Sequence, residues 1–324
     1  MCELKTSFIS QKVTDALLNT VPDGAGDLFT TIRRAGLRFL RRTLIRVLHD
    51  PLIRYELDGT SLLLPLSHQL PFIRASHPKY STNVARIAAI ALSKYPDLSM
   101  IDIGANVGDT VAIVRHDAHF PIMCIDGDPA FFSILEKNTR TWTDVSLVRS
   151  FVGEINGPTP TRVIADHGTA RLIADTSGGS STQTETLTNI LSAHSTFTPP
   201  RLIKIDTDGF DLKIVTHELS LIERLRPIIF LEYDPYFFEQ HQSDGRALFR
   251  ELGSIGYDAA LVFDNTGEFL VYMSLGDDQL QKDIHHFYTG RSGQRYCDIA
   301  FFHAQDADIC AQARLGELSL SNDY

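Results

Sequence analysis

The sequence predicts an α/β protein built on a mostly parallel, seven-stranded, Rossmann-like sheet with helices on both faces. From residue 98 onward, short apolar runs alternate with helical patterns, the order that produces parallel strands joined by helices. A glycine-rich turn, residues 104–108, follows the first apolar run, Met100–Ile103, and precedes a helical pattern at Thr110–Arg115. Such a turn lets backbone N–H groups approach a ligand closely at the carboxyl edge of the sheet.

The remaining elements follow from the same alternation of apolar runs and helical patterns. Strands are expected at Met100–Ile103, Ile122–Ile125, Val145–Val148, Leu202–Ile205, Ile228–Leu231, Ala259–Phe263 and Cys297–Phe302. Helices are expected at Thr110–Arg115, Ala130–Asn138, Thr186–Ser192, Asp211–Leu225, Gly245–Ile255 and Asp278–Phe287. Residues 153–183 are rich in Gly, Pro, Ser and Thr, with β-like runs at Arg162–Ala165 and Ala170–Ala174. We therefore divide the chain into an accessory region (1–97), the sheet domain (98–304) and a C-terminal tail (305–324).

The accessory region contains a basic stretch, residues 31–50, with no acidic residue between Thr31 and Asp50. At helical spacing its leucines and valine share one face: Leu37, Leu40, Leu44, Val47 and Leu48. Its arginines gather on the opposite face: Arg34, Arg38, Arg41, Arg42 and Arg46. Such a helix can lie on an anionic membrane surface, or it can pack on the protein with its arginines in water. After it we expect a hairpin at Tyr55–Leu64 and a helix at Thr82–Lys94, with Ser81 as its N-cap.

Composition sets further bounds. The chain has 324 residues, 43% of them hydrophobic and 22% charged, which is typical of a globular protein, and a net charge of −10 argues against general nucleic-acid binding. The four cysteines, Cys2, Cys124, Cys297 and Cys310, show no metal-binding spacing and fit a reducing compartment. No apolar run approaches the ~18 residues of a membrane span, and the start of the sequence lacks a secretory pattern. We expect a cytoplasmic protein, with the basic helix raising the option of the inner membrane face.

A ribose-binding carboxylate is indicated by spacing. Asp126 ends the second apolar run about 20 residues after Gly104, where a Rossmann-type second strand offers its carboxylate to ribose hydroxyls. The turn is not a true G-x-G-x-x-G, because Asn106 holds the middle position and Asp109 the last. The turn therefore has less room for a pyrophosphate, which favours a nucleoside over a dinucleotide.

Three motifs, in this order, carry a resemblance to a known family. They are Ile101–Gly108 (IDIGANVG), Ile125–Pro129 (IDGDP) and Leu202–Phe210 (LIKIDTDGF). Together they resemble the FkbM family of S-adenosylmethionine-dependent O-methyltransferases, whose motifs read D-x-G-A-N-x-G, F-E-P-x-P and I-K-I-D-x-E-G. Here Asp126 and Asp208 stand where the family has glutamate, which keeps the charge and shortens the reach by a methylene. The likeness spans residues 98–233, with a weaker continuation to Phe302, and leaves the first 97 residues uncovered.

The resemblance implies a class I methyltransferase fold with S-adenosylmethionine as cofactor. Gly104 and Gly108 would admit the methionine moiety beside Asn106, and Asp102 would orient the turn or the amino group of the methionine. Asp126 would accept both ribose hydroxyls, and Ser150 and Phe151 would border the adenine. The predicted cofactor residues are thus Asp102, Gly104, Asn106, Gly108, Asp126, Ser150 and Phe151. The implied acceptor is a hydroxyl of a glycan, which can be lipid-linked, or of a polyketide-like natural product.

Methyl transfer to an unactivated hydroxyl requires a base or a metal. Asp206 and Asp208 follow a buried strand, and two like charges at this distance raise one pKa, as a base needs. The same pair could instead bind Mg²⁺ with Glu232 or Asp234 as a third oxygen ligand; we favour the metal-free base. Glu232, Tyr233 and His241 are predicted on the substrate side, with His241 as the alternative base.

Two other functions stay open from the sequence. One is an NAD-dependent oxidoreductase on a related sheet, although Asn106 and the missing third glycine count against it. The other is a non-catalytic adaptor that uses a methyltransferase-like domain to bind a glycan or a membrane.

Overall fold

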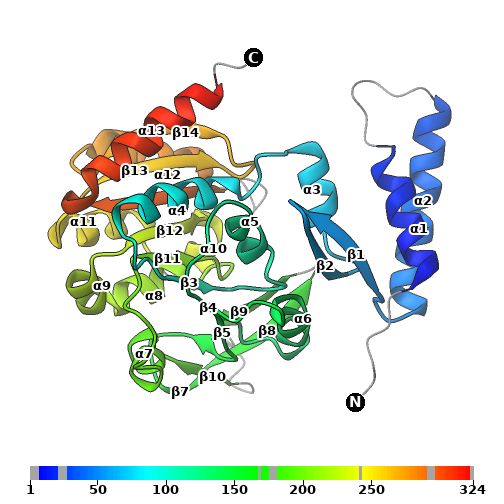
Figure 1. Cartoon of the computed structure of the whole chain (residues 1–324), viewed down its shortest axis with the longest axis horizontal. Helices are drawn as coiled ribbons and strands as arrows, with labels where there is room; N and C mark the ends of the chain where they lie inside the picture. Colours follow the sequence, from blue (N-terminus) through cyan, green and yellow to red (C-terminus); the bar gives the residue numbers. More distant parts are fainter. Residues whose placement is uncertain are drawn as a thin grey trace.

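The computed structural model describes residues 7–20, 28–166, 169–174, 181–240, 243–289 and 296–321. Its centre is an eight-stranded sheet in the order β14-β13-β15-β12-β11-β3-β4-β5 (Figure 1). The strands are β3 (Met100–Ile103), β4 (Ile122–Ile125), β5 (Val145–Val148), β11 (Leu202–Ile205), β12 (Ile228–Tyr233), β13 (Tyr257–Asp264), β14 (Phe269–Ser274) and β15 (Cys297–His303).

The sheet is mixed and has one strand more than predicted. β5, β4, β3, β11 and β12 are parallel to one another, and β15 runs antiparallel between β12 and β13. All seven predicted strands are present, whereas β14, paired antiparallel with β13 at the edge, was not predicted. Three of the six residues of β14 are exposed and one is buried, because an edge strand packs on one neighbour only. Its apolar residues therefore give a weaker signal than those of a buried strand do.

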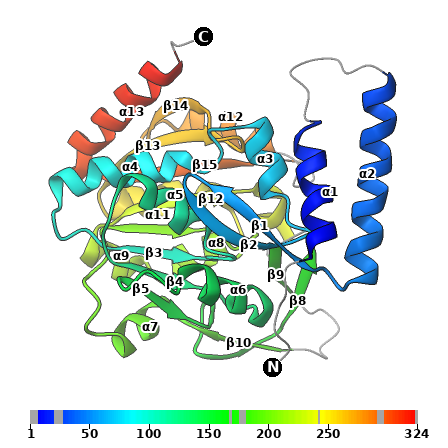
Figure 2. The same ribbon diagram turned by 45° about the vertical axis from the view of Figure 1, so that its right-hand side comes forward.

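Helices cover both faces of the sheet, as predicted, and divide the core into two apolar clusters (Figures 1 and 2). One cluster includes α4 (Thr82–Lys94), α5 (Asp109–Asp117), α6 (Pro129–Thr139) and α13 (Ala307–Ser321). The other includes α7 (Leu187–Ala193), α8 (Asp211–His217), α9 (Leu219–Leu225), α10 (Pro235–Gln240), α11 (Gly245–Ser254) and α12 (Asp278–Tyr288). The central strands β3, β4, β11 and β12 are buried along their whole length, as strands with helices on both faces must be.

The accessory region consists of α1 (Phe8–Leu18), α2 (Leu28–Val47), the hairpin β1 (Leu52–Leu57)–β2 (Thr60–Pro65) and α3 (Leu70–Ser76). Figures 1 and 2 show α1 and α2 at the edge of the molecule, with the hairpin between them and the sheet domain. The hairpin's Leu57, Leu62 and Leu64 belong to the same apolar cluster as α5 and α6. The hairpin is therefore an integral part of the core.

Two predictions for this region and its neighbourhood met different outcomes. The β-like runs of residues 153–183 are confirmed as β8 (Thr161–Asp166) and β9 (Thr169–Ala174), a hairpin beside the small sheet β6 (Phe151–Val152), β10 (Thr182–Glu185) and β7 (Gly157–Thr159). Ser81, in contrast, does not cap α4. It lies in the left-handed region, with φ 57°, and its side chain makes no capping bond.

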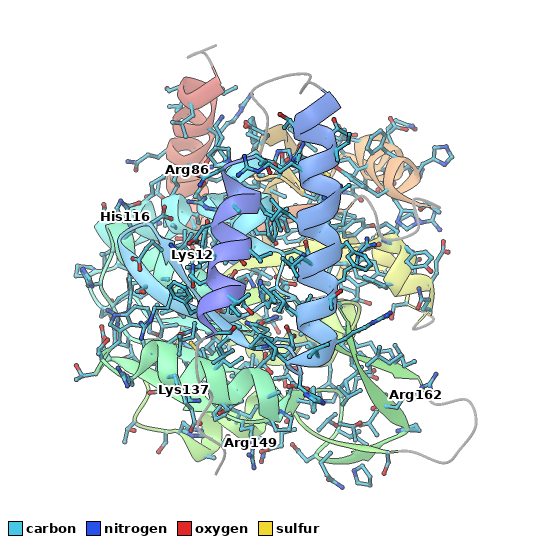
Figure 3. The ribbon with its side chains drawn as sticks, turned by 90° about the vertical axis from the view of Figure 1, so that its right-hand side faces the viewer. Lys12, Arg86, His116, Lys137, Arg149 and Arg162 are labelled. Atoms are coloured by element: carbon cyan, nitrogen blue, oxygen red, sulfur yellow. The ribbon has the colours of Figure 1, made fainter. Side chains whose placement is uncertain are left out.

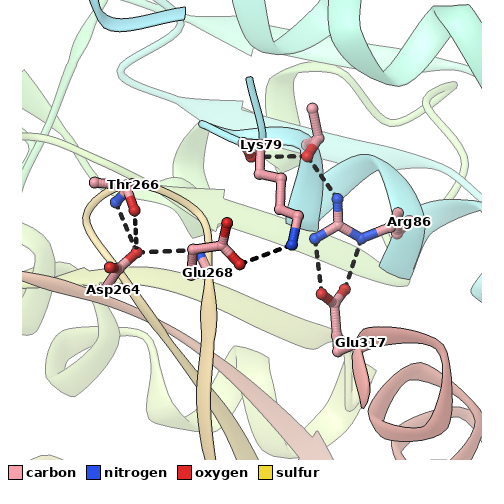
Figure 4. A network of polar contacts seen from close by, with 7 residues as sticks. Lys79, Arg86, Asp264, Thr266, Glu268 and Glu317 are labelled. Carbon is pink, nitrogen blue, oxygen red and sulfur yellow. Dashed lines mark hydrogen bonds and ion pairs between the residues drawn. The ribbon is translucent and has the colours of Figure 1, made fainter. Parts of the chain in front are cut away.

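The predicted C-terminal tail includes a helix, α13, that is fixed to the sheet domain by ion pairs (Figure 4). Arg86 of α4 binds Glu317 of α13 through two nitrogens, at 2.7 and 2.8 Å, and Glu317 is 4% exposed. Nearby, Lys79 contacts Glu268 at 2.8 Å, and the backbone N–H of Glu268 donates to Asp264. These contacts join the segment before α4, the β13–β14 turn and the C-terminal helix.

Replacing Glu317 with glutamine should destabilise the protein, because it leaves the charge of Arg86 without its buried partner. We expect a loss of about 1–3 kcal/mol in the free energy of unfolding, measured by urea titration. The control is Asp308→Asn, in an exposed pair whose lysine, Lys94, keeps Asp306; its cost should stay below about 0.5 kcal/mol. Equal effects of the two substitutions would contradict the assignment.

Candidate functional site

A cavity of about 280 Å³ lies at the carboxyl ends of β3, β4, β11 and β12. This is the edge at which open α/β sheets bind ligands. The cavity is lined by eight of the predicted residues: Gly104, Asn106, Asp126, Ser150, Phe151, Asp206, Asp208 and Glu232. Sequence elements more than a hundred positions apart are thus brought to one site.

Three predicted residues lie elsewhere, and a fourth, His241, falls outside the described residues. Asp102 is fully buried beneath the cavity, against Lys204. Gly108 is the N-cap of α5 and lies in the left-handed region, with φ 85°, which favours glycine there. Tyr233 is buried in the core, where its hydroxyl bonds His285 Nδ1 at 2.9 Å. None of the three lines the cavity.

Asp126 is held by the backbone of the glycine-rich turn. Its Oδ2 accepts the N–H of Asn106 at 2.8 Å, and its Oδ1 accepts the N–H of Asp128 at 2.9 Å. Burial raises the pKa of Asp126 to about 7, although those two N–H donors lower it. Because a carboxylate offers about four acceptor positions, Asp126 keeps capacity for a pair of ligand hydroxyls.

Two glycines allow the close contacts that shape the cavity. A Cβ on Gly104 would lie 1.8 Å from the backbone oxygen of Asp206, so the turn after β3 touches the loop after β11. A Cβ on Gly127 would lie 2.2 Å from the ring of Phe151, which therefore packs on the backbone after β4. Gly127 was not predicted as a site residue. In the sequence, only its position directly after Asp126 indicates that it lies at the site.

Lys204 is the main functional residue that the sequence reasoning missed. Its Nζ lies 2.9 Å from Asp206 Oδ2 and 3.4 Å from Asp102 Oδ1, and the residue is 5% exposed. Burial lowers the pKa of Lys204, but the charges of Asp206 and Asp102 raise it well above its usual value. Burial also raises the pKa of Asp102 to about 6, against the effect of Lys204. A lysine within an apolar run, on a strand next to the one that carries Asp102, was the available signal.

Glu232, on the neighbouring strand β12, also faces the loop after β11 that carries the predicted base. Glu232 is buried, and its Oε2 has no hydrogen-bond partner among the described residues. Burial raises the pKa of Glu232 well above its usual value, and the charges of Asp206, Asp208 and Asp211 add to the effect. Asp206, in contrast, is engaged by Lys204. The loop itself is held by Asp211, which accepts the N–H groups of Thr207 and Gly209.

The accessory region closes the cavity with His68, Tyr80 and Ser81, which no motif predicted. Nδ1 of His68 accepts the N–H of Leu70 at 3.2 Å, so the neutral ring carries its proton on Nε2. Burial lowers the pKa of His68 to about 4, despite a hydrogen bond with Asn106. Burial raises the pKa of Tyr80, whose side chain forms a hydrogen bond with Tyr296, another residue of the cavity lining. These side chains are therefore neutral hydrogen-bonding groups at neutral pH.

A metal centre is not evident. Within the described residues, no group of three or more His, Cys, Asp or Glu side chains is arranged to hold a metal ion. The predicted magnesium site at Asp206 and Asp208 therefore has no support.

The fold and the cavity together define a class of protein. Five parallel strands followed by an antiparallel strand between β12 and β13 give the strand order of class I methyltransferases, which use S-adenosylmethionine. Residues 102–259 match the methyltransferase FkbM domain, so this part of the chain is similar to the FkbM methyltransferases. The match confirms the resemblance and sets aside the NAD-dependent alternative.

Solved structures of other methyltransferases are similar to this chain at low identity. Methyltransferase FkbM from Methylobacillus flagellatus KT is 12% identical, with 90% of this chain and 58% of that chain covered and a TM-score of 0.36. Precorrin-6y C5,15-methyltransferase from Geobacter metallireducens GS-15 is 14% identical (67% and 86% covered, TM-score 0.35). An O-methyltransferase from Bacillus cereus, solved with SAH, is 10% identical (68% and 80% covered, TM-score 0.35). No curated protein sequence matches the chain. At identities and TM-scores this low, the activity of a similar structure is not assigned to this chain.

Cofactor affinity should depend on the charge of Asp126. Because the pKa of Asp126 is raised to about 7, the carboxylate form predicted to accept ribose hydroxyls becomes the major form above that pH, so affinity should rise between about pH 6 and pH 8. Asp126→Asn should weaken binding of S-adenosylhomocysteine by about 1–3 kcal/mol in calorimetry and remove the pH dependence. Unchanged affinity in Asp126→Asn would show that the ribose lies elsewhere.

Proposed function

We propose that the protein transfers a methyl group from S-adenosylmethionine to a hydroxyl oxygen of a glycan or a similar polyhydroxylated small molecule. The observation that carries the proposal is Glu232: a buried carboxyl with a raised pKa and a free oxygen, in the same cavity as Asp126 and the Lys204–Asp206 pair. A hydroxyl acceptor is a weak nucleophile and needs such a base, whereas the methyl donor is already activated.

The cavity's residues fit the cofactor in parts. Asp126 would accept the ribose hydroxyls, and the turn at Gly104–Asn106 would receive the methionine moiety. Phe151, with Ser150 beside it, would border the adenine; Ser150 is itself held by Glu185 at 3.1 Å. Asp102 acts, in this proposal, through Lys204 and not by direct contact.

On the acceptor side, Glu232 Oε2 takes the proton of the reacting hydroxyl. Lys204 fixes the carboxylate of Asp206, which can then accept a hydrogen bond from a second hydroxyl of the same acceptor. Tyr80, Ser81 and Tyr296 add neutral hydrogen-bonding groups around the opening. A cavity lined by these polar side chains suits a sugar, which offers many hydroxyls, better than a largely apolar polyketide. The carboxylates would repel an anionic acceptor.

The first test is a labelled-methyl transfer assay on cell-envelope glycan fractions and on hydroxylated metabolites. Transfer to oxygen, shown by NMR of the product, supports the proposal. Cofactor binding without transfer to any fraction would favour the adaptor, and transfer to nitrogen or carbon would contradict the O-methyl assignment.

Removing the base should slow catalysis and spare the cofactor. Glu232→Gln should lower kcat by about 10²–10⁴-fold with little change in cofactor Kd. In the native protein, kcat should rise with pH through the raised pKa of Glu232, because the base must be deprotonated. Asp206→Asn should mainly raise the KM of the acceptor.

A matched control is Glu251→Gln, a half-buried glutamate on α11 that does not line the cavity. Full activity in Glu232→Gln together with its loss in Asp206→Asn would return the base to the loop predicted from the sequence. We expect chelator to leave the rate unchanged; a loss restored by Mg²⁺ would instead establish a metal role.

A further inference from the structure

α2 presents an apolar face to solvent. Ile32, Phe39 and Val47 are 62, 73 and 64% exposed, and Leu40 and Leu48 are also exposed. Within α2 the first three follow at spacings that place them on one side of a helix. Figure 3 shows α1 and α2 side by side on this edge of the molecule, facing the viewer. We refer to the exposed residues Ile32, Phe39 and Val47, with Arg38, Arg42 and Arg46, as the α2 surface.

The same helix carries an unusual concentration of positive charge. Arg33, Arg38, Arg42 and Arg46 are exposed, and none of the four has a carboxylate partner within the described residues. The chain as a whole carries a net charge of −10, so α2 is a local concentration of positive charge on an acidic protein. Side by side, exposed apolar groups and arginines favour an amphipathic, anionic partner.

One arginine differs from the others and fixes the orientation of α2. Arg41 points inward and donates to the carbonyl oxygens of Leu66, Ser67 and His68, at 2.9, 2.9 and 3.2 Å, while stacking on Phe72. The sequence pattern groups Arg41 with the arginines opposite the apolar face, and this assignment is wrong for Arg41. Of the two arrangements left open for the apolar face, packing on the protein does not hold for Leu40, Val47 and Leu48, which are exposed. α2 is therefore held in an orientation that leaves Ile32, Phe39 and Val47, as well as most of its arginines, exposed to water.

Arg34, Arg38 and Arg42 also line a groove of about 860 Å³ with Ser67, Gln69 and Phe72. Guanidinium groups bind phosphate oxygens through paired N–H donors. The groove thus offers a place for phosphate head groups beside the exposed apolar residues.

We propose that the α2 surface docks the protein on an anionic lipid bilayer, with Ile32, Phe39 and Val47 in the interface and the arginines on lipid phosphates. A nucleic acid would leave the apolar side chains without a partner. A second copy packed symmetrically on this surface would place arginines against arginines. In the described part of the chain no helix could cross a bilayer, so the contact proposed is peripheral. The proposal does not depend on the chemistry of the cavity.

The test is co-sedimentation of the full chain with vesicles. Binding is expected to vesicles of phosphatidylcholine with about 40% phosphatidylserine, absent for pure phosphatidylcholine, and strongly reduced by 0.5 M salt. Arg42→Gln/Arg46→Gln should lower the partition coefficient by about fivefold for each arginine removed. The matched control, Arg246→Gln/Arg250→Gln, removes two exposed arginines of α11 and should leave binding unchanged.

The apolar half of the surface is tested separately. Phe39→Ser should weaken vesicle binding, and the fluorescence of a Phe39→Trp variant should shift to the blue and be quenched by brominated lipid. Unaltered cofactor binding shows that each variant is folded. The proposal is overturned if the native protein ignores anionic vesicles, or if inositol hexaphosphate binds as tightly as vesicles with no effect of Phe39→Ser. A concentration-dependent dimer lost in Phe39→Ser would equally overturn it, in favour of self-association.

Discussion

The site depends on one buried cation. Lys204 stands opposite Asp102 in the register of the parallel strands β11 and β3, and its Nζ reaches forward to Asp206 at the strand end. A lysine with 5% exposure is costly to bury, and two carboxylates at 2.9 and 3.4 Å offset that cost. A shift of one residue in this pairing would turn Lys204 to the other face of the sheet, away from Asp102. The ion pair therefore helps to specify the register of a strand that is apolar on both faces.

That register sets the geometry of everything above it. With β3 and β11 aligned, the turn at Gly104 meets the backbone of Asp206 so closely that a Cβ would not fit. The same turn places the backbone N–H of Asn106 so that it donates to Asp126, which follows the neighbouring strand β4. Glu232 lies near the end of the next strand on the other side, where burial, and then the charges of the loop after β11, raise its pKa. The residues proposed for cofactor and acceptor thus lie on opposite sides of one fixed pair of strands.

Sequence reasoning found the parts of this arrangement that repeat along the chain. Apolar runs located the strands, and the carboxyl end of each strand located Asp126, Asp206 and Glu232, because parallel strands bring those ends to one edge. Lys204 was passed over because a single polar residue hardly alters an apolar run, and its partner is apparent only once the strand order is known. His68 and Tyr80 come from a region that no motif covers. In α2, periodicity separated two faces but could not tell which one packs; that was decided by the carbonyl groups at residues 66–68, which take the donors of Arg41.

The two proposals are linked by the distribution of charge. The cavity gathers carboxylates around a single lysine, whereas α2 gathers arginines without acidic neighbours in its own sequence. An anionic bilayer would therefore be attracted to α2 and repelled from the opening of the cavity. The segment 66–69 connects α2 with the cavity. Arg41 of α2 donates to its backbone carbonyl groups, and the side chain of His68 lines the cavity. A protein held in this way could act on a neutral hydroxyl near a membrane while keeping lipid phosphates away from Glu232. Under the two proposals, an uncharged sugar attached to a membrane lipid would satisfy both constraints.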